Sequence, residues 1–337
     1  MRFFQDGLSR LLIIGMNDLA CEAAKFCKDN GIEVFVFSGQ RFKDLQSIED
    51  ENRTCYERME AIGLNIEELD KLEVDRLSKF KSKDCAVFSF DSPFIFKKDI
   101  ITFFDGKLFN EHGAHLPHGK GGGGFSWRIM EDDREGNVLF HLLTEGIDAG
   151  PIIHQKGFVF PETCRKPLDF MKYQHALNKI ELRNFLSRLK NNHDFKIIEQ
   201  DEFFASYMPR LHTPSQAYID WSWDVEYIRR FILAFSEPYE GAKTFINGKK
   251  IFIYDCYVDS KQIHTHPYKF GIIYNITAEG LRVACKNGTL VITDFRTENL
   301  EQIQLGDRFY TPTTVMDNVF SSRVIYTPKG LKKGLEE

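Results

Sequence analysis

Short apolar runs alternate with amphipathic segments along the first part of the chain. Residues 10–15 form an apolar run that ends at a glycine, and residues 18–31 carry apolar positions at helical spacing. Residues 32–39 are again rich in β-branched and aromatic side chains. A strand, a helix and a second strand within the first forty residues predict a parallel α/β sheet.

The same alternation continues to about residue 200. Residues 41–82 are charged and helix-like, with at most one strand signal. Beyond them the pattern predicts four strands and one long amphipathic helix, over residues 85–95, 106–110, 137–143, 149–160 and 167–192 respectively. We therefore expect residues 1–205 to form a Rossmann-like α/β domain.

The pattern changes near residue 200. Residues 200–215 lose periodicity and carry two prolines, which is typical of a linker. One helix-like segment follows at 224–235. Short β-rich runs separated by glycine and asparagine then occupy 242–247, 250–258, 270–277, 280–285 and 289–295. These runs predict a small β-barrel domain over residues 206–337.

Composition narrows the possible partners. The chain has 337 residues and a formal net charge of −5. Proteins that grip a nucleic-acid backbone usually present a basic face, so we do not expect nucleic acid to be the partner. The seven cysteines include no Cys-x-x-Cys pair, and no apolar run approaches the ~18 residues of a membrane helix. Without a leader pattern at its start, the chain is expected to be cytoplasmic, with reduced thiols and no membrane partner.

The segment "FNEHGAHLPHGKGGGGFSW", residues 109–127, holds the candidate chemistry. His112, His115 and His118 are three residues apart, which would place them on one face only in a helix. Pro117 and the neighbouring glycines oppose a helix, so we expect no metal site. The four glycines are not followed by the G-K-[ST] of a phosphate-binding loop, and the turn after residues 10–15 lacks the G-x-G-x-x-G of a dinucleotide site.

Asn110 and His112 follow a predicted strand directly. In open α/β sheets the chemistry lies at the carboxyl ends of the strands. A carboxylate can orient a histidine and fix its tautomer, and Asp148 lies between two glycines just ahead of an apolar strand. An amide, an imidazole and a carboxylate together indicate a site for proton transfer.

The motif "NEHGAHLP", followed about thirty residues later by "IDAGPI", resembles the 10-formyltetrahydrofolate-dependent formyltransferases. This family includes methionyl-tRNA formyltransferase and the N-formyltransferases of nucleotide-linked amino sugars. The resemblance extends to "CAVFSFDSPFIF", to "GNVLFHLLTEGIDAGPIIHQ", and to the linker "Q…YMPRL" with Gln200. Residues 218–256 look like the start of the family's C-terminal β-barrel domain, which is OB-like. The resemblance is weakest over residues 41–80.

The resemblance implies a catalytic trio of Asn110, His112 and Asp148. Asn110 would stabilise the oxyanion of a tetrahedral intermediate, His112 would accept a proton from the attacking amine, and Asp148 would hold the imidazole. The co-substrate would be 10-formyltetrahydrofolate, with no metal. The residues expected along this co-substrate are Phe88, Ser89, Phe90, Asp91 and Ile147.

The chain departs from the family pattern beside the acceptor. Ala114 stands where the family usually has serine, and residues 119–121 replace an aromatic residue followed by Arg-Gly. Residues 123–124 replace Ala-Pro. The loop is therefore expected to be remodelled, with Lys120, Gly121 and Gly122 at the acceptor. Lys120 either meets an anionic group of the substrate or is an ordinary surface lysine.

The leading hypothesis is N-formylation of a nucleotide-linked amino sugar in bacterial surface-glycan (lipopolysaccharide) biosynthesis. The alternatives are a methionyl-tRNA formyltransferase, a formyltetrahydrofolate hydrolase, a zinc-dependent hydrolase and a catalytically silent sugar-binding protein. Trp221 and Trp223 either stack on a nucleotide base or pack in the core. The β-barrel domain offers a surface for a homodimer. The sequence leaves open the amino sugar, the nucleotide, the position of the amine and the role of residues 121–124.

Overall fold

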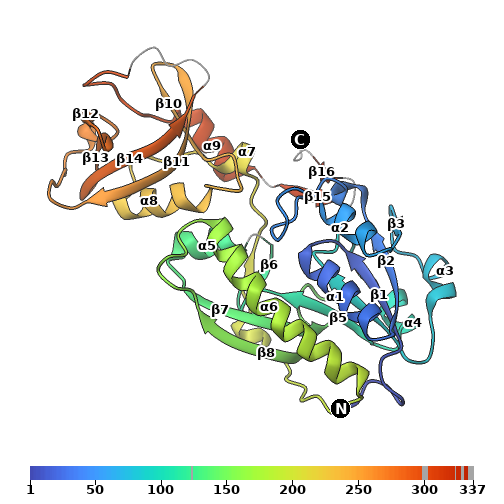
Figure 1. The fold of residues 1–337 in the computed structure, drawn as a ribbon. Helices are drawn as coiled ribbons and strands as arrows, with labels where there is room; N and C mark the ends of the chain where they lie inside the picture. Colours follow the sequence, from blue (N-terminus) through green and yellow to red (C-terminus); the bar gives the residue numbers. More distant parts are fainter. Residues whose placement is uncertain (123, 298–302, 323, 328–329, 333–337) are drawn as a thin grey trace.

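Two large β-sheets, of seven and five strands, are joined by a linker, and two further sheets have two strands each (Figure 1). The computed structural model describes residues 1–122, 124–297, 303–322, 324–327 and 330–332. The first sheet carries the motif residues, and the second is formed by the C-terminal part of the chain. Both were expected from the alternation of apolar and polar positions.

The first sheet has seven strands in the order β3-β2-β1-β4-β5-β7-β8. The strands from β3 to β5 pair in parallel, whereas β7 and β8 are antiparallel. Their bounds are β1 Arg10–Gly15, β2 Glu33–Ser38, β3 Ile66–Glu68, β4 Cys85–Phe90, β5 Leu108–His112, β7 Glu135–Leu142 and β8 Ile152–Val159. The predicted parallel α/β core is confirmed, with an antiparallel pair added beside β5.

Helices cover both faces of this sheet. Their bounds are α1 Asp18–Asp29, α2 Cys55–Ala61, α3 Val74–Leu77, α4 Lys98–Phe103, α5 Gly124–Glu131 and α6 Pro167–Lys190. Helices α1 and α6 share a buried cluster with Leu11, Phe88 and Phe109, whereas Ile100 of α4 packs with Leu12 on the other face. Odd and even strand positions thus serve different faces, as the two-residue period of a strand requires.

Local signals explain where the helices begin. The Asn17 side chain accepts a hydrogen bond from the Ala20 N–H at 2.9 Å and caps α1. Thr54 and Glu57 form a reciprocal capping box at α2. Helix α6 begins at Pro167, a residue whose fixed φ suits the first turn.

The second sheet is antiparallel, in the order β10-β11-β14-β13-β12. Its strands are β10 Ala242–Ile246, β11 Lys249–Asp259, β12 Ile273–Thr277, β13 Gly280–Cys285 and β14 Gly288–Arg296. Single bridges join Tyr310 to Phe245 and Arg308 to Ile272, but β10 and β12 remain the two ends of the strand order. An antiparallel β domain is therefore present, while the expected OB-like barrel is not confirmed.

Shorter elements complete the C-terminal part. They are α7 Thr213–Gln216, α8 Val225–Ala234, α9 Thr313–Ser321, β15 Ile325–Thr327 and β16 Gly330–Lys332. Trp221 is 7% exposed, donates its indole N–H to Thr244 and stacks on Phe309, so it packs in the core. Trp223 packs against Phe231 at the edge of the same cluster.

A single hydrophobic cluster joins the two parts of the chain. Ile129 of α5 and Phe170 of α6 belong to the same buried cluster as Ile232 of α8. Ser126 of α5 also donates a hydrogen bond to the Ala234 carbonyl at 2.8 Å. All seven cysteines are buried and free, as expected of reduced thiols. Within the described ranges, no helix has the length and apolarity needed to span a bilayer.

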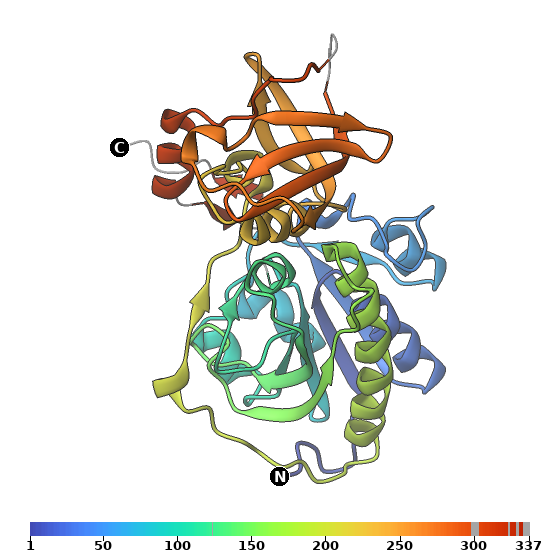
Figure 2. The same cartoon turned by 90° about the vertical axis from the view of Figure 1, so that its left-hand side faces the viewer.

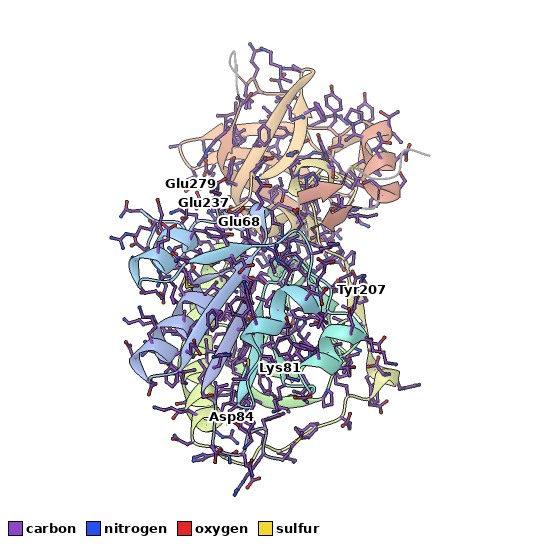
Figure 3. All side chains as sticks on the ribbon, turned by 90° about the vertical axis from the view of Figure 1, so that its right-hand side faces the viewer. Glu68, Lys81, Asp84, Tyr207, Glu237 and Glu279 are labelled. Atoms are coloured by element: carbon purple, nitrogen blue, oxygen red, sulfur yellow. The ribbon has the colours of Figure 1, made fainter. Side chains whose placement is uncertain are left out.

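The linker is an ordered part of the first domain's surface. The strand β9, Tyr207–Met208, pairs in parallel with β6, Lys120–Gly121. Figure 2 shows this segment running along the outside of the lower domain toward the upper one, and Figure 3 labels Tyr207 on it. The sequence predicted a linker here, but not a strand that pairs with the motif segment.

Candidate active site

The end of β5 carries both Asn110 and His112. The last residue pair between β4 and β5 joins Ser89 to Asn110, so the carboxyl end of β5 extends beyond the pairing with β4. On its other side, β5 stays paired with β7 as far as His112. The two side chains therefore project from a rigid strand at the edge where ligands of open α/β sheets bind.

His112 lies between a carboxylate and a backbone carbonyl. Its Nδ1 is 3.7 Å from Asp148 Oδ2, and its Nε2 is 3.3 Å from the Gly119 carbonyl oxygen. Burial lowers the pKa of His112, more than Asp148 raises it. A neutral imidazole at neutral pH follows, and a neutral imidazole is the form that can accept a proton.

Asp148 is held ionised beside this imidazole. Its backbone is left-handed, with φ of 48°, and its Oδ2 accepts the Gly121 N–H at 2.9 Å. Burial acts to raise the pKa of Asp148, but His141, His112 and the Gly121 N–H outweigh it and lower the pKa to about 2. The carboxylate is therefore charged at any physiological pH.

Asn110 contacts a second, deeply buried histidine. Asn110 Nδ2 is 3.1 Å from His141 Nε2 and 3.0 Å from the Glu111 carbonyl oxygen. His141 is 1% exposed, and its Nδ1 lies 2.8 Å from the Leu142 carbonyl, to which only a protonated Nδ1 can donate. His141 Nε2 thus lies between the Asn110 amide and Asp148 Oδ1, which is 3.7 Å away, and so links Asn110 to Asp148. A substrate oxygen would have to replace one of the two acceptors of Asn110 Nδ2.

The linker supports the same residues from outside. Gln200 Nε2 donates to the carbonyl oxygens of Asp148 at 2.8 Å and Gly150 at 2.6 Å. Ser206 Oγ accepts the Gly119 N–H at 2.9 Å, next to the carbonyl that contacts His112. The linker therefore positions the loops on both sides of the imidazole.

The residues expected along the co-substrate differ in how far their side chains are exposed to a ligand. The side chains of Phe88, Ser89 and Phe90 are buried in β4, so the backbone is the part of these residues expected to meet the co-substrate. Asp91 is exposed and left-handed, with φ of 47°, and accepts a hydrogen bond from Asn17. Ile147 is 59% exposed beside Asp148, which fits a residue that packs against a ligand.

The residues expected at the acceptor are in contact with the linker. Lys120 is buried, and its ammonium contacts both carboxylate oxygens of Glu202, at 2.6 and 2.8 Å. An anion at Lys120 would have to compete with Glu202. Gly121 has a φ of 96°, and a Cβ there would lie 2.6 Å from the Met208 carbonyl; one at Gly122 would lie 3.1 Å from Arg210 Cβ. The glycines thus allow β9 to approach closely.

The three histidines of the motif have separate neighbours. His112 faces Asp148, whereas the His118 ring lies 6.3 Å from the Phe204 ring of the linker. His115 lies near Gly157 of β8. In the part of the chain that the structure describes, no three His, Cys, Asp or Glu side chains are grouped as metal ligands would be.

Sequence reasoning missed His141 and Ser206, and noted Gln200 only as part of the resemblance. His141 did leave a signal, because it is the single polar residue within the apolar run "VLFHLL", residues 138–143. Its pairing with Asn110 needs the antiparallel β5–β7 register. Ser206 and Glu202 left no signal that separates them from other polar linker residues.

Comparison with known proteins agrees with this geometry. Residues 212–309 match the family model "Formyl transferase, C-terminal domain". The chain is 29% identical over 221 residues, 65% of its length, to the bifunctional polymyxin resistance protein ArnA of Wigglesworthia glossinidia brevipalpis. It is 27% identical over 203 residues, 60% of its length, to the methionyl-tRNA formyltransferase of Pseudothermotoga lettingae. The matched segments span 32% and 64% of these two relatives.

A solved structure shares the fold. The N-formyltransferase from Helicobacter canadensis, in complex with folinic acid and dTDP-3-aminofucose, aligns with a TM-score of 0.65 and 18% identity. The alignment covers 86% of this chain and all of that one. Residues 212–309 thus match the C-terminal domain of formyl transferases, and the chain is similar in sequence and in fold to formyltransferases.

Proposed function

We propose that this chain transfers a formyl group from 10-formyltetrahydrofolate to the amine of a nucleotide-linked amino sugar. The observation that carries the proposal is the neutral, buried imidazole of His112 between ionised Asp148 and the carboxyl end of β5, with Asn110 on the same strand. A base and an amide donor at one point suit acyl transfer to an amine.

The chemistry follows from these three side chains. The acceptor nitrogen attacks the formyl carbon, a C–N bond forms and the formyl oxygen becomes an oxyanion. The Asn110 amide donates a hydrogen bond to this oxyanion, while the His112 imidazole takes the proton from the nitrogen. Asp148 stabilises the imidazolium. When the intermediate collapses, the bond to N10 of the folate breaks and the proton returns to that nitrogen.

Two observations favour an amino sugar as the acceptor. The structural relative from Helicobacter canadensis was solved with folinic acid and dTDP-3-aminofucose. The chain itself carries a net charge of −5, which does not favour a polyanionic RNA. A role in lipopolysaccharide biosynthesis and a homodimer are further predictions that belong to this proposal.

A methionyl-tRNA formyltransferase is the second candidate. It is favoured by the relative from Pseudothermotoga lettingae, whose match covers 60% of this chain. The proposed catalytic steps would be the same, since both acceptors present an amine. Only the surface that holds the rest of the acceptor would differ.

A transfer assay distinguishes the two. Purified protein is given 10-formyltetrahydrofolate with a panel of nucleotide-linked amino sugars, with charged initiator tRNA, or with no acceptor. We expect formylated sugar and no formylated tRNA, and His112→Ala should lower the rate on the order of 10³-fold or more. Transfer to tRNA alone would favour the second candidate, and folate turnover without an acceptor would indicate a hydrolase. An unchanged rate in His112→Ala would remove the acid–base assignment.

A further inference from the structure

A second group of polar side chains lies at the carboxyl ends of β1, β4 and β5. It consists of Asn17 after β1, Asp91 after β4, Glu111 in β5 and Asn178 of α6. Asn17 Nδ2 donates to Asp91 Oδ2 at 2.9 Å, and Asn178 Nδ2 donates to Glu111 Oε1 at 2.8 Å. None of these four residues takes part in the catalytic steps proposed above, and of the four only Asp91 is expected along the co-substrate.

The strand order places this group at the point where the order of the first sheet reverses. The chain runs outward from β1 to β3 and then crosses to β4 on the other side of β1, so the order reverses between β1 and β4. Ligands of open α/β sheets bind outside the carboxyl ends of the strands at such a reversal. Asn17 and Asp91 flank it, and their hydrogen bond spans it.

The register of β5 connects this group to the candidate active site. Pairing with β4 ends at Asn110, so Glu111 and His112 both lie beyond it. Their side chains point to opposite faces of the sheet, but neighbouring Cα atoms are only about 3.8 Å apart. A group the size of one sugar ring at the end of β4 can therefore contact Glu111 while its amine reaches His112.

The cluster offers hydrogen-bond acceptors. The carboxyl oxygens of Glu111 and Asp91 can accept hydrogen bonds, and Asn178 adds its amide oxygen. Asn178 is 4% exposed, and within the described residues its buried Oδ1 has no hydrogen-bond partner. An unpaired buried acceptor is unfavourable, so a ligand that donates here would gain from the contact. The complementary ligand carries hydroxyl and amine donors.

The charges favour the same ligand. Burial and the nearby Asp91 carboxylate raise the pKa of Glu111 to about 8, although the Asn178 hydrogen bond acts to lower it. A phosphate or another anion beside Glu111 would raise this pKa further and would make the carboxylate form still less favourable. A cationic or hydrogen-bond-donating group would instead stabilise the carboxylate. The phosphates of a nucleotide sugar are therefore expected elsewhere.

We propose that Glu111, together with Asn178, binds the amine-bearing, hydroxylated ring of the acceptor, and that Glu111 is a specificity-determining residue. The inference rests on the proposed formyl transfer and adds to it a subsite for the sugar. In the family motif N-x-H, Glu111 occupies the position between the two motif residues. It thereby places a carboxylate one residue from the proposed base.

The Glu111→Gln variant tests the proposal, because glutamine keeps the shape and can still accept the hydrogen bond from Asn178. We expect the KM for the amino-sugar acceptor to rise at least tenfold, with the KM for 10-formyltetrahydrofolate unchanged. The matched control is Glu145→Gln, which removes the same charge from an exposed position three residues before Asp148 and should change neither constant. An unchanged acceptor KM in Glu111→Gln, or an equal rise in both KM values, would overturn the proposal.

A binding experiment without a formyl donor separates this proposal from the proposed function. Calorimetry compares a dTDP-linked amino sugar with the dTDP-linked sugar that carries a hydroxyl in place of the amine. We expect wild-type protein to bind the amine at least tenfold more tightly, and Glu111→Gln to lose most of that preference. Equal binding of both sugars by wild-type protein overturns the subsite. Failure of formyl transfer in wild-type protein, with the binding preference intact, would instead count against the proposed reaction.

Discussion

Two carboxyl groups at the same edge of one sheet have opposite electrostatic environments. The pKa of Asp148 is lowered to about 2, and that of Glu111 is raised to about 8. Burial acts to raise the pKa of both. Asp148 is surrounded by two imidazoles and the Gly121 N–H, whereas Glu111 has one amide donor and a second carboxylate nearby. The partners, and not depth alone, set the charge of each group.

The comparison suggests that Asp148 and Glu111 have different roles. On one side of the end of β5, a carboxylate that is always ionised keeps an imidazole oriented. On the other side, a carboxyl group with a pKa of about 8 has a second carboxyl group and an amide as its partners among the described residues. Groups whose environments separate their pKa values in this way are typical of sites with distinct chemical roles.

Removing the charge of Asp148 should have the largest effect. The Asp148→Asn variant keeps the shape of the side chain but loses the stabilisation of the His112 imidazolium. We expect kcat for formyl transfer to fall on the order of 10³-fold, with little change in either KM. Steady-state kinetics with both substrates measures this. A loss smaller than tenfold would mean that the two carboxyl groups do not differ in catalytic role.

Removing the carboxyl group of Glu111 should make the protein more stable at alkaline pH. A carboxyl group whose pKa is raised by folding contributes stability below its unfolded pKa, near 4.3, and loses that contribution as pH rises through about 8. Glu111→Gln should therefore gain stability relative to wild type between pH 5 and pH 8.5, by on the order of 4 kcal/mol. Urea unfolding at both pH values measures the difference. An equal difference at the two pH values contradicts the raised pKa.

Loosening the support of Asp148 should have the smallest effect. Gln200→Ala removes two hydrogen bonds to the left-handed turn that carries Asp148 but leaves its charge in place. We expect kcat to fall about tenfold, since misplaced catalytic groups lose rate without losing their chemistry. Gln155→Ala, at an exposed position of β8, is the matched control. Equal activity of the two variants would show that the turn holds its geometry without the linker.

The sequence predicted the parts of the fold that depend on local periodicity. The strand at residues 10–15, the helix after Asn17 and the long helix from Pro167 lie where the pattern indicated. His112 Nδ1 lies 3.7 Å from Asp148 Oδ2, and Asn110 precedes His112 on β5, while the catalytic roles of these three residues stay predictions. The sequence did not predict that β7 and β8 run antiparallel, or that β9 adds to the motif segment.

The contacts that sequence reasoning missed are long-range. His141 reaches Asn110 only through the β5–β7 register, and Gln200 reaches Asp148 across 52 positions of the chain. Glu111 was overlooked because the motif leaves its position unspecified. The pKa of Glu111 depends on Asp91, which follows β4, and on Asn178, which lies on α6. A prediction of these partners would have required the three-dimensional arrangement.

The pairing of β9 with β6 has a consequence for recombination among related proteins. Because Ser206 and Gln200 contact the loops beside His112 and Asp148, the connecting segment belongs to the catalytic half. A chimaera that joins residues 1–199 of this chain to the remainder of a relative would replace those contacts with foreign ones. A junction after Pro209 would keep them. Exchange of C-terminal domains is thus best attempted at a crossover point beyond β9.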